Sequence, residues 1–148
     1  MIVSHAFILF VSYAAFAVAL LTGTLFLVQE SRLKRKDPTV LSAGAAFPLE
    51  LLDRVNLYAV VAGFLLFSVG MLQGSRLARL EWGAYWNADP KELWSLVTWG
   101  AYAVVLGLRL TAGLRGRRVV LLSVMSFLLV IFTFVGVNYL VGGRHVFF

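Results

Sequence analysis

Residues 2–28 read IVSHAFILFVSYAAFAVALLTGTLFLV, a run in which only His5 can carry a charge. About 20 apolar residues in helical form are enough to cross the hydrocarbon core of a bilayer. The run is therefore predicted to be a transmembrane helix, and it decides the fold class. It is too long, and its start too poor in basic residues, for a cleaved signal peptide.

The composition of the whole chain also indicates a membrane protein. Of its 148 residues, 61% are hydrophobic and 14% are charged, whereas soluble domains carry about 25% charged residues. The absence of cysteine excludes a disulfide, a thiolate metal site and a cysteine nucleophile. The net charge of +6 is explained by loops that set membrane orientation. We expect a lipid bilayer around the chain and no nucleic-acid partner.

Three further uncharged runs predict three more crossings. The four transmembrane helices are expected at about residues 2–28, 54–73, 93–109 and 119–141. Residues 39–52 mix small and apolar residues with Pro48, and we interpret them as a short interfacial helix. The expected fold is all-α, one membrane domain over residues 1–148, with an external tryptophan-rich segment at about residues 75–92.

The basic residues predict the orientation of this bundle. Eight of the 13 Lys and Arg residues follow the first and third predicted helices: Arg32, Lys34, Arg35, Lys36, Arg109, Arg115, Arg117 and Arg118. By the positive-inside rule these loops are cytoplasmic. Both termini and the tryptophan-rich segment then face outward, toward the periplasm or exterior, in a multi-pass protein of the cell membrane.

Residues 82–99, WGAYWNADPKELWSLVTW, hold all four tryptophans of the chain. Tryptophan and tyrosine rings offer large flat faces with a polar edge, which suit both a membrane interface and a flat apolar ligand. Trp94 and Trp99 are also explained as a belt facing lipid. Asp89 before Pro90 is typical of a helix N-cap, a role compatible with facing a ligand.

His5 and His145 are the only histidines, and both are predicted to lie on the outward face beside the tryptophans. Singly, each is explained as an interfacial polar residue. Together they match the paired axial ligands of heme, so non-covalently bound b-type heme is the predicted cofactor. Basic residues on that face are candidate partners of its carboxylates, arginine being best suited. They are Arg76, Arg79, Lys91 and Arg144.

The pattern Trp82-Gly-x-Tyr-Trp86-x-x-Asp89-Pro-Lys-Glu-x-Trp94-Ser-Leu-x-Thr-Trp99 resembles a known signature. It is similar to the tryptophan-rich WWD motif of the cytochrome c assembly family of heme-handling membrane proteins, above all to its CcsA type. The resemblance covers nearly the whole chain. It includes His5 with Tyr13 and Phe16, Leu52-Asp-Arg, Gly63-Phe64, Gly70, Arg115-Gly-Arg-Arg118, Phe132-Thr-Phe, Gly136-Val-Asn138 and Gly143-Arg-His145.

The resemblance implies a function as well as a fold. His5 and His145 match the axial heme ligands of the family, and Trp82, Trp86 and Asp89 match positions of its motif. Heme would be presented on the outer face to an apocytochrome c, whose Cys-x-x-Cys-His thiols add to the vinyl groups. A second membrane subunit would complete the heme lyase or synthetase.

Two positions depart from the family pattern. Ala88 stands where a second tryptophan usually precedes the aspartate, and Leu93 where threonine is frequent. Ala88 removes a flat face beside the predicted heme. This leaves a second hypothesis, in which the chain keeps its heme as an electron-transfer or anchoring subunit of a larger membrane redox complex that serves cytochrome c. A heme-free structural subunit is the third hypothesis.

Overall fold

The computed structural model describes residues 1–36 and 48–141, and this part of the chain forms helices and no strands. The helices are α1 (Ile2–Lys34), α3 (Leu49–Trp82), α4 (Pro90–Leu110) and α5 (Arg117–Ile131), continued by the π-helix η1 (Phe132–Val141). Four helical stretches in this part are long and apolar enough to cross a membrane. The predicted all-α class with four membrane-spanning helices is confirmed.

Two of the helices extend beyond the apolar runs that predicted them. α1 continues to Lys34, whose Nζ lies 2.9 Å from Glu30 Oε1 one turn earlier. α3 starts at Leu49 and continues to Trp82, so residues 75–82 extend this helix. Of the predicted interfacial segment, residues 39–47 lie outside the described residues and residues 49–52 belong to α3.

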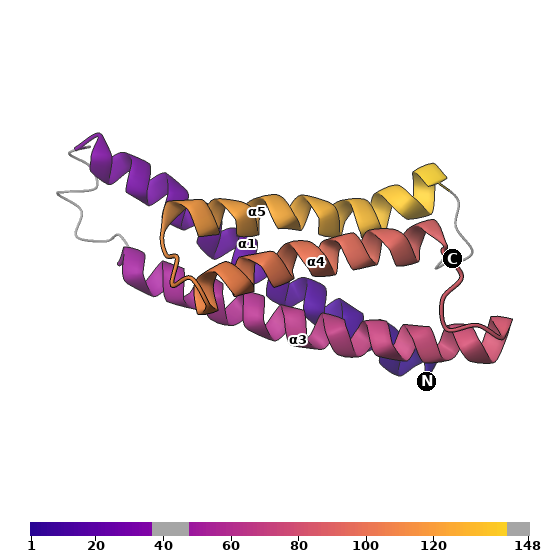
Figure 1. Cartoon of the computed structure of the whole chain (residues 1–148). Coiled ribbons are helices and arrows are strands. Elements are labelled where there is room, and N and C mark those ends of the chain that lie inside the picture. The colour runs from indigo at the N-terminus through magenta and orange to yellow at the C-terminus, as the bar shows by residue number, and fades with distance from the viewer. Residues whose placement is uncertain (37–47, 142–148) are drawn as a thin grey trace.

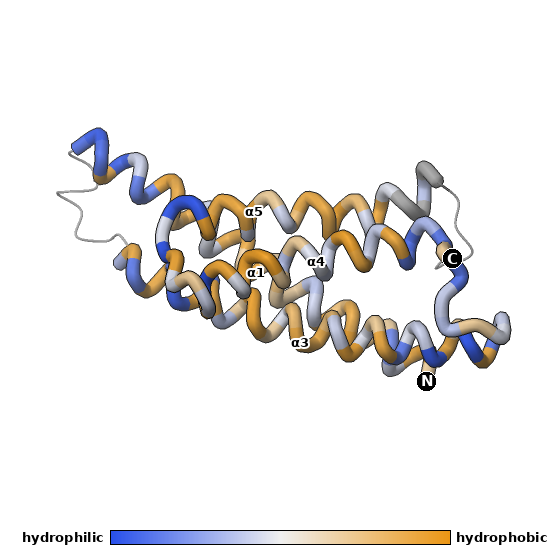
Figure 2. The backbone as a smooth tube through the Cα atoms, in the orientation of Figure 1, coloured by the Kyte–Doolittle hydropathy of each residue, from blue (hydrophilic) through white to orange (hydrophobic). Residues whose placement is uncertain are grey.

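The four helices lie side by side along one direction (Figure 1). α1 packs along α3, and α5 packs against both α1 and α4. The N-terminus lies at the same end as the turn between α3 and α4, and the turn between α4 and α5 lies at the other end (Figure 1). Apolar residues fill the middle of the bundle and polar residues gather toward its ends (Figure 2).

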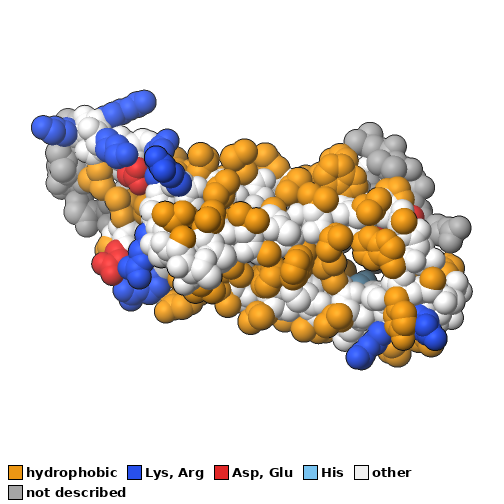
Figure 3. All heavy atoms as spheres, in the orientation of Figure 1, with side chains coloured by type: hydrophobic (Ala, Val, Ile, Leu, Met, Phe, Trp, Pro, Cys, Tyr) orange, Lys and Arg blue, Asp and Glu red, His pale blue; other side chains and the backbone are white. Residues whose placement is uncertain are grey.

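Charge is concentrated at the end of the bundle where α1 finishes and α5 begins. Lys and Arg side chains gather there on the face that Figure 3 shows, while an apolar band covers the middle of the molecule. Arg32, Lys34, Arg117 and Arg118 are all exposed at this end. This end is the one that the positive-inside rule predicts to be cytoplasmic.

Aromatic stacking fills the centre of the bundle. The rings of Phe16 in α1 and Tyr102 in α4 stack with centroids 3.9 Å apart and planes 8° apart. Gly63 of α3 faces the same ring, since a Cβ built there would lie 2.6 Å from Phe16 Cδ1. Ser12 Oγ donates a hydrogen bond to the Gly63 carbonyl oxygen at 2.8 Å. The close approach of α1 to α3 therefore requires a glycine here.

Gly63→Ala is expected to lower the free energy of unfolding by about 1–3 kcal/mol, because the added methyl overpacks a filled interface. Gly100→Ala in α4 is the control, since nothing lies within 4 Å of the added Cβ. It should be neutral or gain up to about 1 kcal/mol from helix propensity. Equilibrium unfolding in mixed detergent micelles measures both, and an equal response of the two variants would contradict this packing.

Candidate functional site

The segment between α3 and α4, residues 83–89, folds back onto the end of α3. The helix ends at Gly83, whose φ of 77° lies in the left-handed region that glycine adopts without strain. Ser75 Oγ donates to the Tyr85 carbonyl oxygen at 3.0 Å. The guanidinium carbon of Arg79 lies 4.6 Å from the centre of the Tyr85 ring. These contacts hold Tyr85 against α3.

The start of α4 is tied to the same segment. Asp89 is the N-cap residue of α4 and Pro90 follows in the first turn, as predicted. The backbone N–H of Asn87 donates to Glu92 Oε2 at 2.9 Å, which connects the segment to the first helical turn. Ala88 between them is exposed and has a φ of 53°. A left-handed conformation costs a residue other than glycine about 1–2 kcal/mol.

Ala88→Gly is expected to raise the free energy of unfolding by up to about 1 kcal/mol, because it relieves this backbone strain. Ala84→Gly is the matched control, since Ala84 lies in the same segment and its φ is not positive. There, added freedom of the unfolded chain should cost about 0.5–1 kcal/mol instead. Unfolding in detergent compares the two, and a loss of stability in both would refute strain at Ala88.

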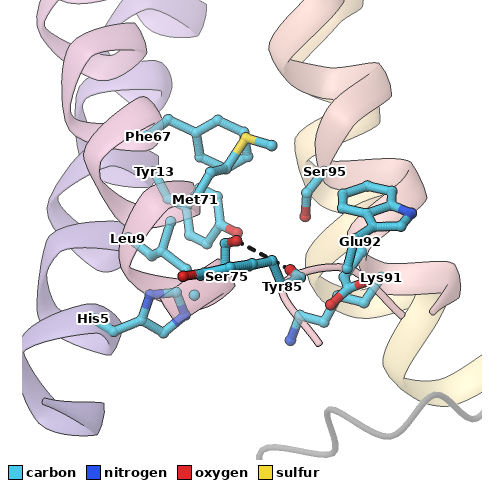
Figure 4. A pocket seen from close by; sticks show the side chains of 12 residues that line it. His5, Leu9, Tyr13, Phe67, Met71, Ser75, Tyr85, Lys91, Glu92 and Ser95 are labelled. Carbon is cyan, nitrogen blue, oxygen red and sulfur yellow. Dashed lines mark hydrogen bonds between the residues drawn. The ribbon is translucent and has the colours of Figure 1, made fainter. Parts of the chain in front are cut away.

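A cavity lies between α1, α3 and α4 at this end of the bundle (Figure 4). About 610 Å³ of space between atoms lies in it, a figure that includes the part open to solvent. Its lining residues are His5, Leu9, Tyr13, Phe67, Met71, Gly74, Ser75, Tyr85, Trp86, Lys91, Glu92 and Ser95. The cavity is therefore partly open to solvent and is lined by three helices and the segment of residues 83–89.

The walls of the cavity differ in character. Leu9 of α1 and Phe67 and Met71 of α3 form an apolar side, and the α4 side carries Lys91 and Glu92 (Figure 4). An apolar wall with a few convergent polar groups is the usual composition of a ligand site. The arrangement suits a ligand that is largely apolar and carries charged groups at one edge.

His5 packs directly on the backbone of α3. A Cβ built at Gly74 would lie 2.9 Å from His5 Cε1, so no larger residue fits at this position without moving the imidazole. In Figure 4 the His5 ring lies on the α1 side of the cavity, across from the residues of α4. The glycine therefore sets the position of the imidazole at the cavity wall.

Two of the predicted aromatic and histidine site residues line this cavity, namely His5 and Trp86. Trp82 is the last residue of α3, and Asp89 is the N-cap residue of α4 at the end of the segment of residues 83–89. Neither is part of the cavity lining. Of the predicted residues His5, Trp82, Trp86 and Asp89, the structure thus brings His5 and Trp86 together at the cavity wall.

The two predicted arginines that the structure describes are not part of the cavity lining. Arg76 and Arg79 are exposed, and neither lines it. Arg79 is stacked on Tyr85, which itself lines the cavity. Arg144 and the second histidine, His145, lie outside the described residues, so their roles stay predictions.

Trp94 and Trp99 pack between helices. The Trp94 ring meets Phe132 of η1 edge to face, with centroids 4.6 Å apart. Trp99 stacks on Phe64 at 5.3 Å, and its Nε1 donates to Ser68 Oγ at 2.9 Å. Trp94 therefore joins α4 to η1, and Trp99 joins α4 to α3. A belt of tryptophans facing lipid does not predict these contacts between helices.

Several lining residues were missed by the sequence analysis, among them Met71, Ser75, Glu92 and Ser95. The spacing of these residues in the sequence is one signal that could have found them. Met71 and Ser75 are four residues apart on α3, and Lys91 and Ser95 are four residues apart on α4. Residues at this spacing share one face of a helix.

The fold and the site define a multi-pass membrane protein with a cavity of mixed apolar and charged lining at one end of its helix bundle. A family model described as cytochrome C assembly protein matches residues 1–145, and the chain belongs to this family. The predicted membership of the cytochrome c assembly family is thereby confirmed.

The curated relatives support the same assignment. The cytochrome c biogenesis protein CcsA of Prochlorococcus marinus (strain MIT 9312) is 32% identical over 162 residues, covering 97% of this chain and 52% of that protein. CcsA of Guillardia theta is 32% identical over 155 residues, covering 95% and 52%. CcsA of Gloeobacter violaceus is 43% identical over 96 residues, covering 65% and 28%. The chain spans about half the length of the curated relatives that it matches.

Proposed function

We propose that this chain binds heme in the cavity between α1, α3 and α4 and presents it for attachment to apocytochrome c. The observation that carries the proposal is the cavity itself, which joins an imidazole, His5, to an aromatic residue of the tryptophan-rich segment, Trp86. Membership of the cytochrome c assembly family supports the same reading. Relatives of this chain are named for cytochrome c biogenesis.

The lining residues fit a heme group. Heme needs an axial nitrogen or sulfur ligand, apolar contact for its macrocycle and a cation for its carboxylates. The cavity supplies the His5 imidazole, apolar and aromatic side chains such as Phe67 and Trp86, and the cation Lys91. Each requirement is met by a residue at the cavity wall.

Each residue would then have a separate role. His5 would ligate the iron from α1, and His145, outside the described residues, is proposed as the second ligand. Trp86 and Tyr85 would cover the macrocycle and exclude water from it. Bound heme would supply the vinyl groups that the apocytochrome thiols attack. Because the chain's own part is to hold and orient heme, its contribution to the rate would be positioning.

The proposal includes a location and partners. The cavity lies at the end of the bundle away from the main cluster of basic residues, so it faces the periplasm or exterior if that cluster is cytoplasmic. A second membrane subunit would complete the heme lyase. The apocytochrome would approach from the outer side, where the segment of residues 83–89 borders the cavity.

Heme titration of the purified chain in detergent tests this proposal. A saturable shift of the Soret band, with distinct oxidised and reduced spectra, is expected. An unchanged spectrum throughout the titration would contradict heme binding. In cells, deletion of the protein should abolish cytochrome c maturation. Intact maturation, together with heme that stays bound and is reversibly reduced, would instead assign the chain to a redox complex.

A further inference from the structure

Lys91 is a buried cation at the cavity wall. It lies in the first turn of α4 and is only 7% exposed, although lysine is one of the residue types least often buried. In Figure 4 it lies on the α4 side of the cavity, across from His5 on α1. The cavity therefore has the imidazole of His5 on one side and the ammonium group of Lys91 on the other.

The remaining charged groups near the cavity do not duplicate this charge. Glu92 also lines the wall, and its Oε2 accepts the hydrogen bond from the Asn87 backbone at 2.9 Å. That bond directs the carboxylate toward residues 83–89. Arg76 and Arg79 are exposed outside the lining. Among the described residues that line the cavity, Lys91 is the cation.

We propose that Lys91 binds a carboxylate of the ligand, so that the cavity selects a porphyrin diacid over an uncharged porphyrin of the same shape. The inference rests on the proposed heme site and adds a specificity residue to it. A charge-assisted hydrogen bond is stronger than a neutral one. Burial strengthens it further, because less water screens the two charges. The sequence alone favoured arginine for this role and gave Lys91 as a further candidate.

Binding of two metal-free porphyrins tests the inference without iron ligation. The probes are protoporphyrin IX, which carries two carboxylates, and its dimethyl ester, which carries none. The purified wild-type chain is expected to bind the diacid about tenfold or more tightly than the ester. Lys91→Met should abolish most of that preference. Lys91→Arg should keep much of it, which separates loss of charge from loss of fold.

A matched control comes from the same end of the bundle. Arg76→Met removes an exposed positive charge outside the lining and should leave the preference for the diacid as it is. If Lys91→Met keeps the full preference, or if wild type binds both porphyrins equally well, Lys91 does not bind a carboxylate. If wild type binds heme and neither porphyrin, the inference also fails. If it binds none of the three, the proposed heme site itself is wrong.

Discussion

Replacing Arg109 by leucine is expected to lower the free energy of unfolding by about 3–5 kcal/mol, because it leaves a carboxylate in the bundle without its partner. Arg109 Nη2 donates to Asp53 Oδ1 at 2.9 Å and to Asn56 Oδ1 at 3.0 Å. The Arg109 side chain is 3% exposed and that of Asp53 is 18% exposed. Little water screens this pair, so its loss should be felt strongly.

Asn56 extends the pair into a network that reaches all four helices. Its Nδ2 donates to the Ala19 carbonyl oxygen of α1 at 2.7 Å. The same nitrogen lies 3.3 Å from Ser123 Oγ of α5. Arg109 of α4 is thus joined through α3 to α1 and α5. Replacing Arg109 should therefore break an ion pair and also loosen the helix packing at the end of the bundle where α4 finishes.

Arg54→Leu is the matched control for Arg109→Leu. Arg54 pairs with Glu50 at 3.1 Å on the surface of α3, with the two side chains 58% and 83% exposed. An exposed pair contributes no more than about 1 kcal/mol. Unfolding in detergent should separate the two variants clearly. Combining Arg109→Leu with Asp53→Leu should recover much of the loss, because the unpaired charge is then gone. Equal losses for Arg109→Leu and Arg54→Leu would contradict the network.

The contacts of Arg109 with α3 could not be predicted from the local sequence. From the sequence, this arginine was predicted only as one of the basic loop residues that set the membrane orientation, whereas it lies in the last turn of α4 with its side chain buried. Its partners lie 56 and 53 positions away in the chain, on another helix. Hydropathy is a property of a short window, so it predicts that a helix crosses the membrane and not which polar residues meet inside the bundle.

The four helices themselves were predictable, because a long uncharged run has few alternatives in a membrane. Their ends were less so, since polar residues such as Glu30 and Lys34 continue α1 by pairing along it. At the site, residue type pointed to His5 and Trp86. Lys91 was one cation among several, because the face that α4 turns to the cavity depends on the backbone of residues 83–89, which includes two left-handed residues.

His5→Ala is expected to weaken heme binding by at least about 100-fold, because loss of a metal ligand should exceed the 10–100-fold cost of losing a partner of a ligand. This prediction rests on the proposed heme site. Metal-free protoporphyrin IX should bind the variant nearly as tightly as wild type, since it has no iron to ligate. Added imidazole should restore part of the heme affinity by filling the space that the side chain leaves.

Two further variants separate ligation from contact. Ser4 is exposed and precedes His5 in the chain, and its Oγ donates to the Met1 carbonyl oxygen at 2.7 Å. Ser4→Ala removes this hydroxyl and should leave heme binding unchanged. Gly74→Ala keeps the ligand but adds a Cβ that would lie 2.9 Å from His5 Cε1. It should shift the imidazole and weaken heme binding, with little effect on the metal-free porphyrin. Heme titrations followed by absorption measure all three variants. Equal heme affinity in His5→Ala and wild type would show that the iron is held elsewhere.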